Sequence, residues 1–274
     1  MYSGGNSDPH LQAFTGQQFE FCGTDRPECK GQAFAIASEA RMQVNAEVDR
    51  LAGPDAWPAA GTWITGLGLR SAAGAGMAVE LRMRKDAAYT VVPEGGKTRA
   101  LQPEGAPKGA AGLRALLAAA SVNGEDVLGK VGSGETLDLG GGNSVHLPAN
   151  THTGDATDGP VMVVKTPDTT WTWYLESEDT WHLDFKVALN AGNAITRMHG
   201  LLGQTLHWAR DSPAVLEGGD ELRYAVRDGL LGSDFAFNLF GKAGGRAPAG
   251  SRRELTQATS AGLAAGSPAA LALV

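Results

Sequence analysis

Residues 180–189 read TWHLDFKVAL, and their pattern is the clearest indication of the fold class. Apolar side chains stand at every second position from Trp181 to Leu189, and polar or small ones stand between them. Successive side chains of a β-strand point to opposite faces of its sheet. The alternation therefore predicts a strand with one buried and one solvent-facing side.

Residues 41–49 and 77–83 alternate in the same way, and Gln43, Asn45 and Glu47 form the polar side of the first segment. Shorter candidate strands, separated by turns that contain Gly or Pro, lie at residues 19–21, 33–38, 62–69, 90–93, 161–166 and 170–175. This rhythm predicts an all-β protein, an antiparallel β-sandwich with long Gly/Pro loops and at most one short helix.

The candidate helix is residues 112–120, where Leu113, Leu116 and Leu117 have helical spacing. It runs into Asn123-Gly124, a pair typical of hairpin turns. Stretches rich in Gly and Pro, or without periodicity, are expected to be connecting loops: residues 94–111, 140–142 and 148–159. We expect one β domain in residues 1–240, followed by a Gly/Ala-rich linker or tail in residues 241–274.

The composition argues against several classes of protein. The chain of 274 residues carries 23 Lys and Arg against 30 Asp and Glu, and a net charge of −7 argues against nucleic acid as a partner. No run approaches the roughly 18 apolar residues of a membrane span, so none is expected. The opening MYSGG lacks the basic stretch and apolar core of a secretory signal. Either the protein stays inside the cell or the chain is a fragment.

Two sequence features bear on stability. Cys22 and Cys29 flank six residues that include Gly23 and Pro27, a spacing that a tight loop can close into a disulfide. Two free thiols on a turn are the alternative, and the C-x-x-C spacing of a metal site is absent. Most of the six Trp residues are expected to be core residues, because aromatic side chains bury a large area.

The motifs of catalysis and cofactor binding are incomplete. Residues 95–98 (GGKT) resemble the end of a phosphate-binding loop, but Val91 stands where its first Gly is needed. Ser133 has one Gly too few for a nucleophile elbow. We expect no cofactor, no metal site and no enzymatic activity. The enzymatic alternative is a hydrolase with a site built from loops, whose candidate residues are His146, His152, Asp155 and Glu176.

A family resemblance begins at residues 7–21, SDPHLQAFTGQQFEF. The segment resembles the opening of the von Willebrand factor type D domain, which has Gly-Asp-Pro-His, then Phe-Asp-Gly, then a strand. Residues 198–205, MHGLLGQT, are similar to the Gly-Leu-Cys-Gly-Asn-Phe stretch near the end of that domain. The resemblance covers about residues 7–208. Its motif residues here are Asp8, Pro9, His10, Gly16, Gly200, Leu201, Leu202 and Gly203.

Two branches of this family fit better than the cysteine-rich one. HGLLGQ, at residues 199–204, is similar to the carboxy-terminal domain of inter-alpha-trypsin inhibitor heavy chains. Residues 217–224 (EGGDELRY) and 228–235 (DGLLGSDF) are similar to the tail of plant root cap and late-embryogenesis-related proteins, the nearest group. The resemblance implies a secreted or wall-associated, non-enzymatic β-sandwich module.

The sequence also departs from the type D pattern. Thr15 replaces the Asp of the Phe-Asp-Gly turn, and Gln204 and Thr205 stand where the family supplies Asn and Asp oxygens. Because calcium requires six to eight oxygen ligands with several carboxylates, we assign no calcium site. Leu202 replaces a Cys of the family. We expect apolar packing to replace the missing disulfide, and a positive φ at Gly200 or Gly203.

These observations together predict a non-catalytic extracellular or cell-wall-associated module. It would present its loops or a sheet face to an extracellular protein or a matrix polymer. A third interpretation, beside the hydrolase, is a linking module of a larger secreted chain, which the Gly/Ala-rich end after Lys242 favours. The sequence leaves the oligomeric state open.

Overall fold

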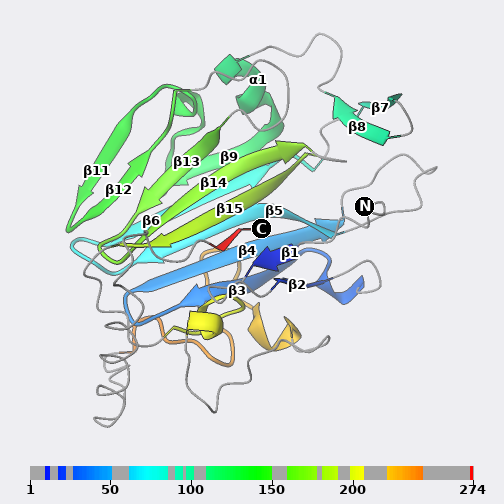
Figure 1. Cartoon of the computed structure of the whole chain (residues 1–274). Coiled ribbons are helices and arrows are strands. Elements are labelled where there is room, and N and C mark those ends of the chain that lie inside the picture. Colours follow the sequence, from blue (N-terminus) through cyan, green and yellow to red (C-terminus); the bar gives the residue numbers. More distant parts are fainter. Residues whose placement is uncertain are drawn as a thin grey trace, which may run out of the picture.

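The computed structural model describes twelve stretches of the chain (Figure 1). They are residues 10–12, 18–22, 27–50, 62–85, 90–94, 97–101, 109–149, 159–177, 181–190, 198–206, 221–242 and 272–273. Motif residues Asp8, Pro9 and Gly16 lie outside these stretches, as do Trp57 and Trp208.

Two antiparallel sheets form the body of the protein, as the sequence predicts. The seven strands of the first sheet are, in spatial order, β10 (Glu125–Asp126), β9 (Leu117–Val122), β6 (Met77–Met83), β5 (Thr62–Ser71), β4 (Met42–Arg50), β3 (Gln32–Ser38) and β16 (Ala225–Val226). The six strands of the second are β11 (Thr136–Gly140), β12 (Asn143–His146), β13 (Pro160–Lys165), β14 (Thr169–Ser177), β15 (Trp181–Leu189) and β17 (Ala272–Leu273).

Smaller elements complete the described structure. Two hairpins pair β1 (His10–Gln12) with β2 (Gln18–Glu20), and β7 (Thr90–Glu94) with β8 (Lys97–Leu101). One α-helix, α1 (Gly109–Leu116), precedes β9. The 3₁₀ turns are η1 (Pro27–Cys29), η2 (Leu128–Lys130), η3 (Gly203–Leu206) and η4 (Glu221–Tyr224). No helix among the described residues is long and apolar enough to cross a membrane.

A single apolar core lies between the two sheets. Residues 181–189 form β15, and their side chains alternate between buried and half-buried as predicted. Trp171 of β14 packs beside Phe185 of β15, with ring centroids 5.6 Å apart. The prediction that most Trp residues are core residues is confirmed for Trp63, Trp171, Trp173 and Trp181, each of which is buried.

The helix prediction is half wrong. α1 ends at Leu116, and residues 117–120 belong to β9, where Leu117 pairs with Met83 and Ala120 pairs with Leu81 of β6. Ala and Leu favour helix, but pairing with the edge of β6 that faces away from β5 outweighs that preference. The predicted turn at Asn123-Gly124 is present and joins β9 to β10, with φ of +51° and +81°.

The predicted loop at residues 94–111 is also partly wrong. It contains the whole of β8, which pairs with β7 from Leu101 to Lys97, and its last three residues begin α1. Of the sequence GGKT, Gly95 and Gly96 lie outside the described residues, and Lys97 and Thr98 begin β8. The triple Gly at residues 140–142 does form the expected sharp turn, between β11 and β12.

The polar side of β4 is not exposed to solvent, contrary to the prediction for residues 41–49. Gln43 and Asn45 are each only 1% exposed. The segment after β16 covers both side chains. Asn45 Nδ2 donates hydrogen bonds to the carbonyl oxygens of Leu230 (2.8 Å) and Gly232 (2.9 Å) in this segment. The first sheet is thus covered on both faces over β4 and β5.

Candidate functional site

The Gly-Leu-Leu-Gly turn of the type D resemblance lies against the edge of β3. His199 exchanges two backbone hydrogen bonds with Ser38, of 2.6 and 2.7 Å. Leu201 and Leu202 then donate from their backbone nitrogens to Ala35 and Ile36, at 2.8 and 2.9 Å. Because β16 pairs only with residues 33 and 34 of β3, the turn covers the rest of that edge.

Gly200 allows this close approach. Its φ is +105°, a conformation that residues with a side chain rarely adopt. A Cβ there would lie 2.6 Å from the carbonyl oxygen of Ile36, and both Leu201 and Leu202 are fully buried. Gly203 differs, because its φ is not positive and a Cβ would instead meet the flexible Met198 side chain at 2.6 Å. The turn is therefore built for packing.

The predicted disulfide is present. Cys22 and Cys29 are bonded, with their Cα atoms 5.7 Å apart, and both side chains are buried. The hydroxyl of Thr62 donates a hydrogen bond to the carbonyl oxygen of Cys22, which ties the disulfide loop to the start of β5. Of the remaining motif residues, His10 begins β1 and pairs with Glu20 of β2.

The candidate residues of a hydrolase do not come together where the structure describes them. His146 of β12 lies opposite Val163, which lies opposite Thr172 of β14. Glu176 is four residues further along β14, about 13 Å away along the strand and two strands across. His152 and Asp155 lie outside the described residues. Within those that are described, no three His, Cys, Asp or Glu side chains gather as metal ligands.

One cluster of charges lies on the outer side of β4 and β6. Glu47 forms ion pairs with both Arg82 and Lys85, and Lys85 also contacts Asp49 at 2.6 Å. Glu80 pairs with Arg82 in turn. Burial lowers the pKa of Lys85, but its hydrogen bonds to Asp49 and Glu47 outweigh burial and raise the pKa above its ordinary value. These ion pairs connect β4 to β6 and to Lys85 just after it, which favours a structural role for the cluster.

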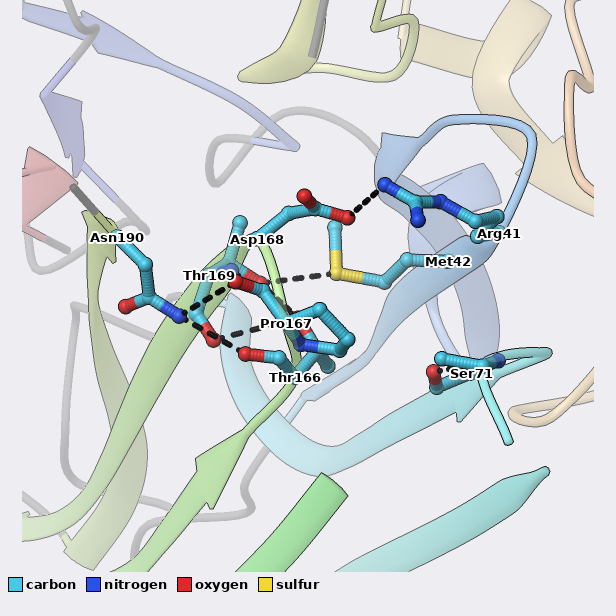
Figure 2. A network of polar contacts seen from close by, with 9 residues as sticks. Arg41, Met42, Ser71, Thr166, Pro167, Asp168, Thr169 and Asn190 are labelled. Atoms are coloured by element: carbon cyan, nitrogen blue, oxygen red, sulfur yellow. Dashed lines mark hydrogen bonds and ion pairs between the residues drawn. The ribbon is translucent and has the colours of Figure 1, made fainter. Parts of the chain in front are cut away.

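A second polar network closes one end of the sandwich, at the turn between β13 and β14 (Figure 2). Thr166 and Thr169 bond to each other through their hydroxyls (3.0 Å), and Trp171 Nε1 donates to the Thr169 hydroxyl at 2.9 Å. Asn190 Nδ2 donates to the carbonyl oxygen of Thr166 at 2.8 Å. The Thr169 hydroxyl donates to Met42 Sδ of β4 at 3.1 Å, so the turn bonds to the facing sheet.

An ion pair extends this network to the turn between β3 and β4. Arg41 pairs with Asp168 (Figure 2), and Glu39, from the same turn as Arg41, is only 6% exposed. Burial raises the pKa of Glu39, and the nearby Asp168 adds to the increase while Arg41 opposes it. These contacts connect the ends of the two sheets. We therefore assign the network a structural role.

Among the described residues, the outer face of the second sheet also carries polar side chains, most of which belong to neither of these two groups of contacts. We call this outer face the polar face and define it by ten half-buried or exposed residues: Thr136, Asp138, His146, Lys165, Thr170, Thr172, Tyr174, Glu176, Asp184 and Lys186. In cross-strand register, His146 lies opposite Thr136 on one side and Val163 on the other. Thr172 lies opposite Val163 and Lys186, so one row crosses five strands.

Contacts within the polar face hold its side chains in place. Thr136 Oγ1 lies 2.8 Å from His146 Nδ1. Lys186 Nζ lies 4.7 Å from the centre of the Tyr174 ring, a cation–π contact between neighbouring strands. Burial raises the pKa of Tyr174, and the charge of Glu176 raises it further, so the phenol stays protonated and can donate a hydrogen bond at neutral pH.

Sequence reasoning found only part of this face. The alternation in residues 180–189 and 170–175 marks their solvent-facing side chains, but β11 and β12 are too short and too rich in Gly to stand out. Which residues share a row depends on register, and a shift of one residue would move each side chain to the other face.

Comparison with protein-family models, with curated proteins and with solved structures finds no match for this chain.

Proposed function

We propose that this chain is a non-catalytic, extracellular or cell-wall-associated interaction module of the type D and root cap kind. It binds a hydroxyl-rich matrix polymer through the polar face of its second sheet. The observation that carries the proposal is the row Thr136, His146, Val163, Thr172 and Lys186, which crosses five adjacent strands in register. A broad sheet face of this kind suits an extended polymer better than a small molecule.

The chemistry of the face supports a neutral polysaccharide as the polymer. Lys165 and Lys186 stand among Asp138, Asp184 and Glu176, so neither sign of charge dominates. The hydroxyl of Thr172 can both donate and accept, as the hydroxyls of a sugar do. The hydroxyl of Thr170 donates to Asn190 Oδ1 and that of Thr136 bonds to His146 Nδ1, and their oxygens can still accept. A polyanion or polycation would be attracted to one part of this surface and repelled by another.

The disulfide supports an extracellular setting. Disulfides form and persist in oxidising compartments and are rare in the cytosol. The Cys22–Cys29 bond is buried, which keeps it away from reductants once it has formed. The proposed type D kinship rests on the sequence resemblance, in which the Gly-Leu-Leu-Gly turn is the second motif. This turn occupies a defined structural position, the edge of β3, at the end of the region that resembles that domain.

Binding to insoluble polysaccharides tests the proposal. The protein is mixed with particles of cellulose, xylan or chitin, and the fraction that sediments with the particles is measured. Tyr174→Ala with Lys186→Ala should reduce binding at least tenfold. Arg227→Ala is the matched control, because Arg227 is exposed in the segment that follows β16 and also carries one positive charge. It should bind like the parent.

Three results would contradict the proposal. Equal binding by the Tyr174 and Lys186 double variant would exclude the polar face, provided that its thermal melt matches that of the parent. Absence of binding to all three polymers would exclude the neutral polysaccharide. Release of new reducing ends from any of them would contradict the non-catalytic assignment and favour a hydrolase.

A further inference from the structure

The strand β11 forms one edge of the second sheet. In the part of the chain that the structure describes, β11 pairs with β12 alone, and Figure 1 shows it as the outermost strand of that sheet. The side chains of Leu137 and Leu139 are half-buried. The residues that alternate with them, Thr136, Asp138 and Gly140, are exposed to solvent. The outer side of β11 is therefore accessible to another strand.

The register with β12 determines which backbone groups of β11 face this edge. The backbone nitrogen of Leu147 donates to the carbonyl oxygen of Glu135 at 2.8 Å, so these two residues form a hydrogen-bonded pair. Hydrogen-bonded and non-bonded pairs alternate along an antiparallel ladder. Leu137 is therefore bonded to β12. The N–H and C=O groups of Thr136 and Asp138 are directed to the outer side.

The edge of β11 is complementary to itself, because Thr136 and Asp138 stand symmetrically on either side of Leu137. Two copies of β11 can run antiparallel with Leu137 opposite Leu137. Thr136 of each copy then lies opposite Asp138 of the other, and each such pair can exchange two backbone hydrogen bonds. The two Asp138 carboxylates do not lie directly opposite each other, so this register avoids the destabilising contact of like charges.

We propose that the edge of β11 is a dimerisation site, to which β11 of a second copy adds in this register. The twofold axis passes between the two Leu137 residues, so both copies use the same surface. Leu137 packs against the core and is only half-buried. In a non-bonded pair the two Cα atoms are about 4.5 Å apart, so each Leu137 side chain covers apolar surface that the other leaves exposed.

The same pairing joins the polar faces of the two copies. Residues that lie opposite each other in neighbouring strands point to the same side of the sheet. The row that ends at Thr136 in one copy therefore continues from Asp138 through Ser144 and Lys165 in the second copy. The row crosses five strands in each copy and ten in the dimer. The gain for polymer binding rests on the proposed function, whereas the pairing itself does not.

The dimer should be weak in solution. One pair of short strands buries less surface than the roughly 1,200 Å² at the lower end of stable interfaces. A register shift between Asp138 and Gly140 also limits the regular part of the strand. Short length, charge and irregularity keep an edge strand from pairing without limit. Because the twofold pairing uses the β11 edge of both copies, it closes at a dimer.

A single introduced thiol tests the register. The two Cys residues of the sequence are bonded to each other, so they supply no competing thiol. With Leu137→Cys, the two new thiols would face each other, and a Cα spacing of about 4.5 Å permits a disulfide. Mild oxidation should convert this variant to a covalent dimer on a non-reducing gel.

Leu139→Cys is the matched control for the register. Leu139 would lie opposite Glu135 of the second copy, four residues or about 13 Å along the strand from the second Leu139. Disulfides require Cα atoms within about 7 Å, so this variant should stay monomeric. Equal dimer from both variants, or none from Leu137→Cys, would overturn the proposed pairing.

Sedimentation equilibrium without oxidant tests the backbone contacts, at protein concentrations up to about 1 mM because the interface is small. Thr136→Pro removes the outward N–H group, and Thr136→Val keeps it while losing the same hydroxyl contact with His146. The parent and Thr136→Val should form dimers as the concentration rises, and Thr136→Pro should remain monomeric with a thermal melt like that of Thr136→Val. A parent that stays monomeric at every concentration, or a Pro variant that dimerises like the parent, would contradict the dimer. No polysaccharide is present, so these results do not depend on the proposed function.

Discussion

Asn45 and Leu230 are 185 residues apart in the sequence, yet the side-chain amide of Asn45 donates to the carbonyl oxygen of Leu230 at 2.8 Å. The same amide nitrogen also donates to Gly232 at 2.9 Å. Gln43 Nε2 in turn donates to Asn45 Oδ1 at 2.5 Å, so a short polar chain runs along the outer side of β4. This contact holds the segment after β16 on the first sheet.

Gly68 should be intolerant of any side chain because of this segment. A Cβ on Gly68 would lie 2.6 Å from the carbonyl oxygen of Leu230. Gly68→Ala must therefore push the segment away from β5, and we expect a loss of about 1–3 kcal/mol in the free energy of unfolding. Urea denaturation measures it. Gly129→Ala is the matched control, since nothing lies within 4 Å of a Cβ there. Equal stability of the two variants would contradict the close contact.

Gly200 combines a steric clash with an unfavourable backbone conformation. Gly200→Ala should cost about 3 kcal/mol or more, because strain at positive φ alone costs about 1–3 kcal/mol and the clash with Ile36 adds to it. Gly241→Ala isolates the strain, since Gly241 has φ of +72° and open space around it. It should cost about 1–2 kcal/mol. Thermal melts that rank the two variants in the opposite order would argue against the role of the turn at β3.

The sequence predicts strands well where one face is apolar and the other polar. Residues 77–83 coincide with β6, and residues 180–189 exceed β15 by one residue. The prediction fails in residues 117–120, where Leu-Ala-Ala-Ala carries a helical preference and only pairing with β6 makes a strand. It also fails for β8, whose Gly-rich turn looks like a loop.

Burial of polar side chains is the part that local sequence cannot reveal. Gln43 and Asn45 look solvent-facing because they alternate with apolar residues, and the segment that covers them comes almost 200 residues later. The polar face has the same limitation, because β11 joins β14 and β15 through two intervening strands. Both depend on long-range pairing, which periodicity does not encode.

The Cys22–Cys29 disulfide closes a short loop, so its effect on stability should be moderate. The two residues are seven apart, and closing a loop of this size stabilises by about 2.5 kcal/mol in the chain-entropy view. Replacing both Cys residues by Ser should lower the urea midpoint, and a reductant should then have no further effect. The reductant should lower the midpoint of the parent alone. The bond would be contradicted if the reductant left the urea midpoint of the parent unchanged and the mass of the unreduced parent showed two free thiols.

Glu39 should make the protein less stable as the pH rises from about 4 towards 7. Burial raises the pKa of Glu39 in the folded protein, whereas the unfolded chain has the ordinary value of about 4.3. The unfolded state therefore loses its proton first, and folding becomes less favourable up to the folded pKa. Glu39→Gln should raise the urea midpoint at pH 7 and leave it nearly unchanged at pH 4. Asp168→Asn is the contrasting variant: it removes the ion pair with Arg41 and should lower the midpoint at pH 7. The raised pKa means that ionised Glu39 destabilises the folded protein. A Gln variant that is less stable than the parent at pH 7 would contradict this, because it would show that the Glu39 carboxylate stabilises the fold.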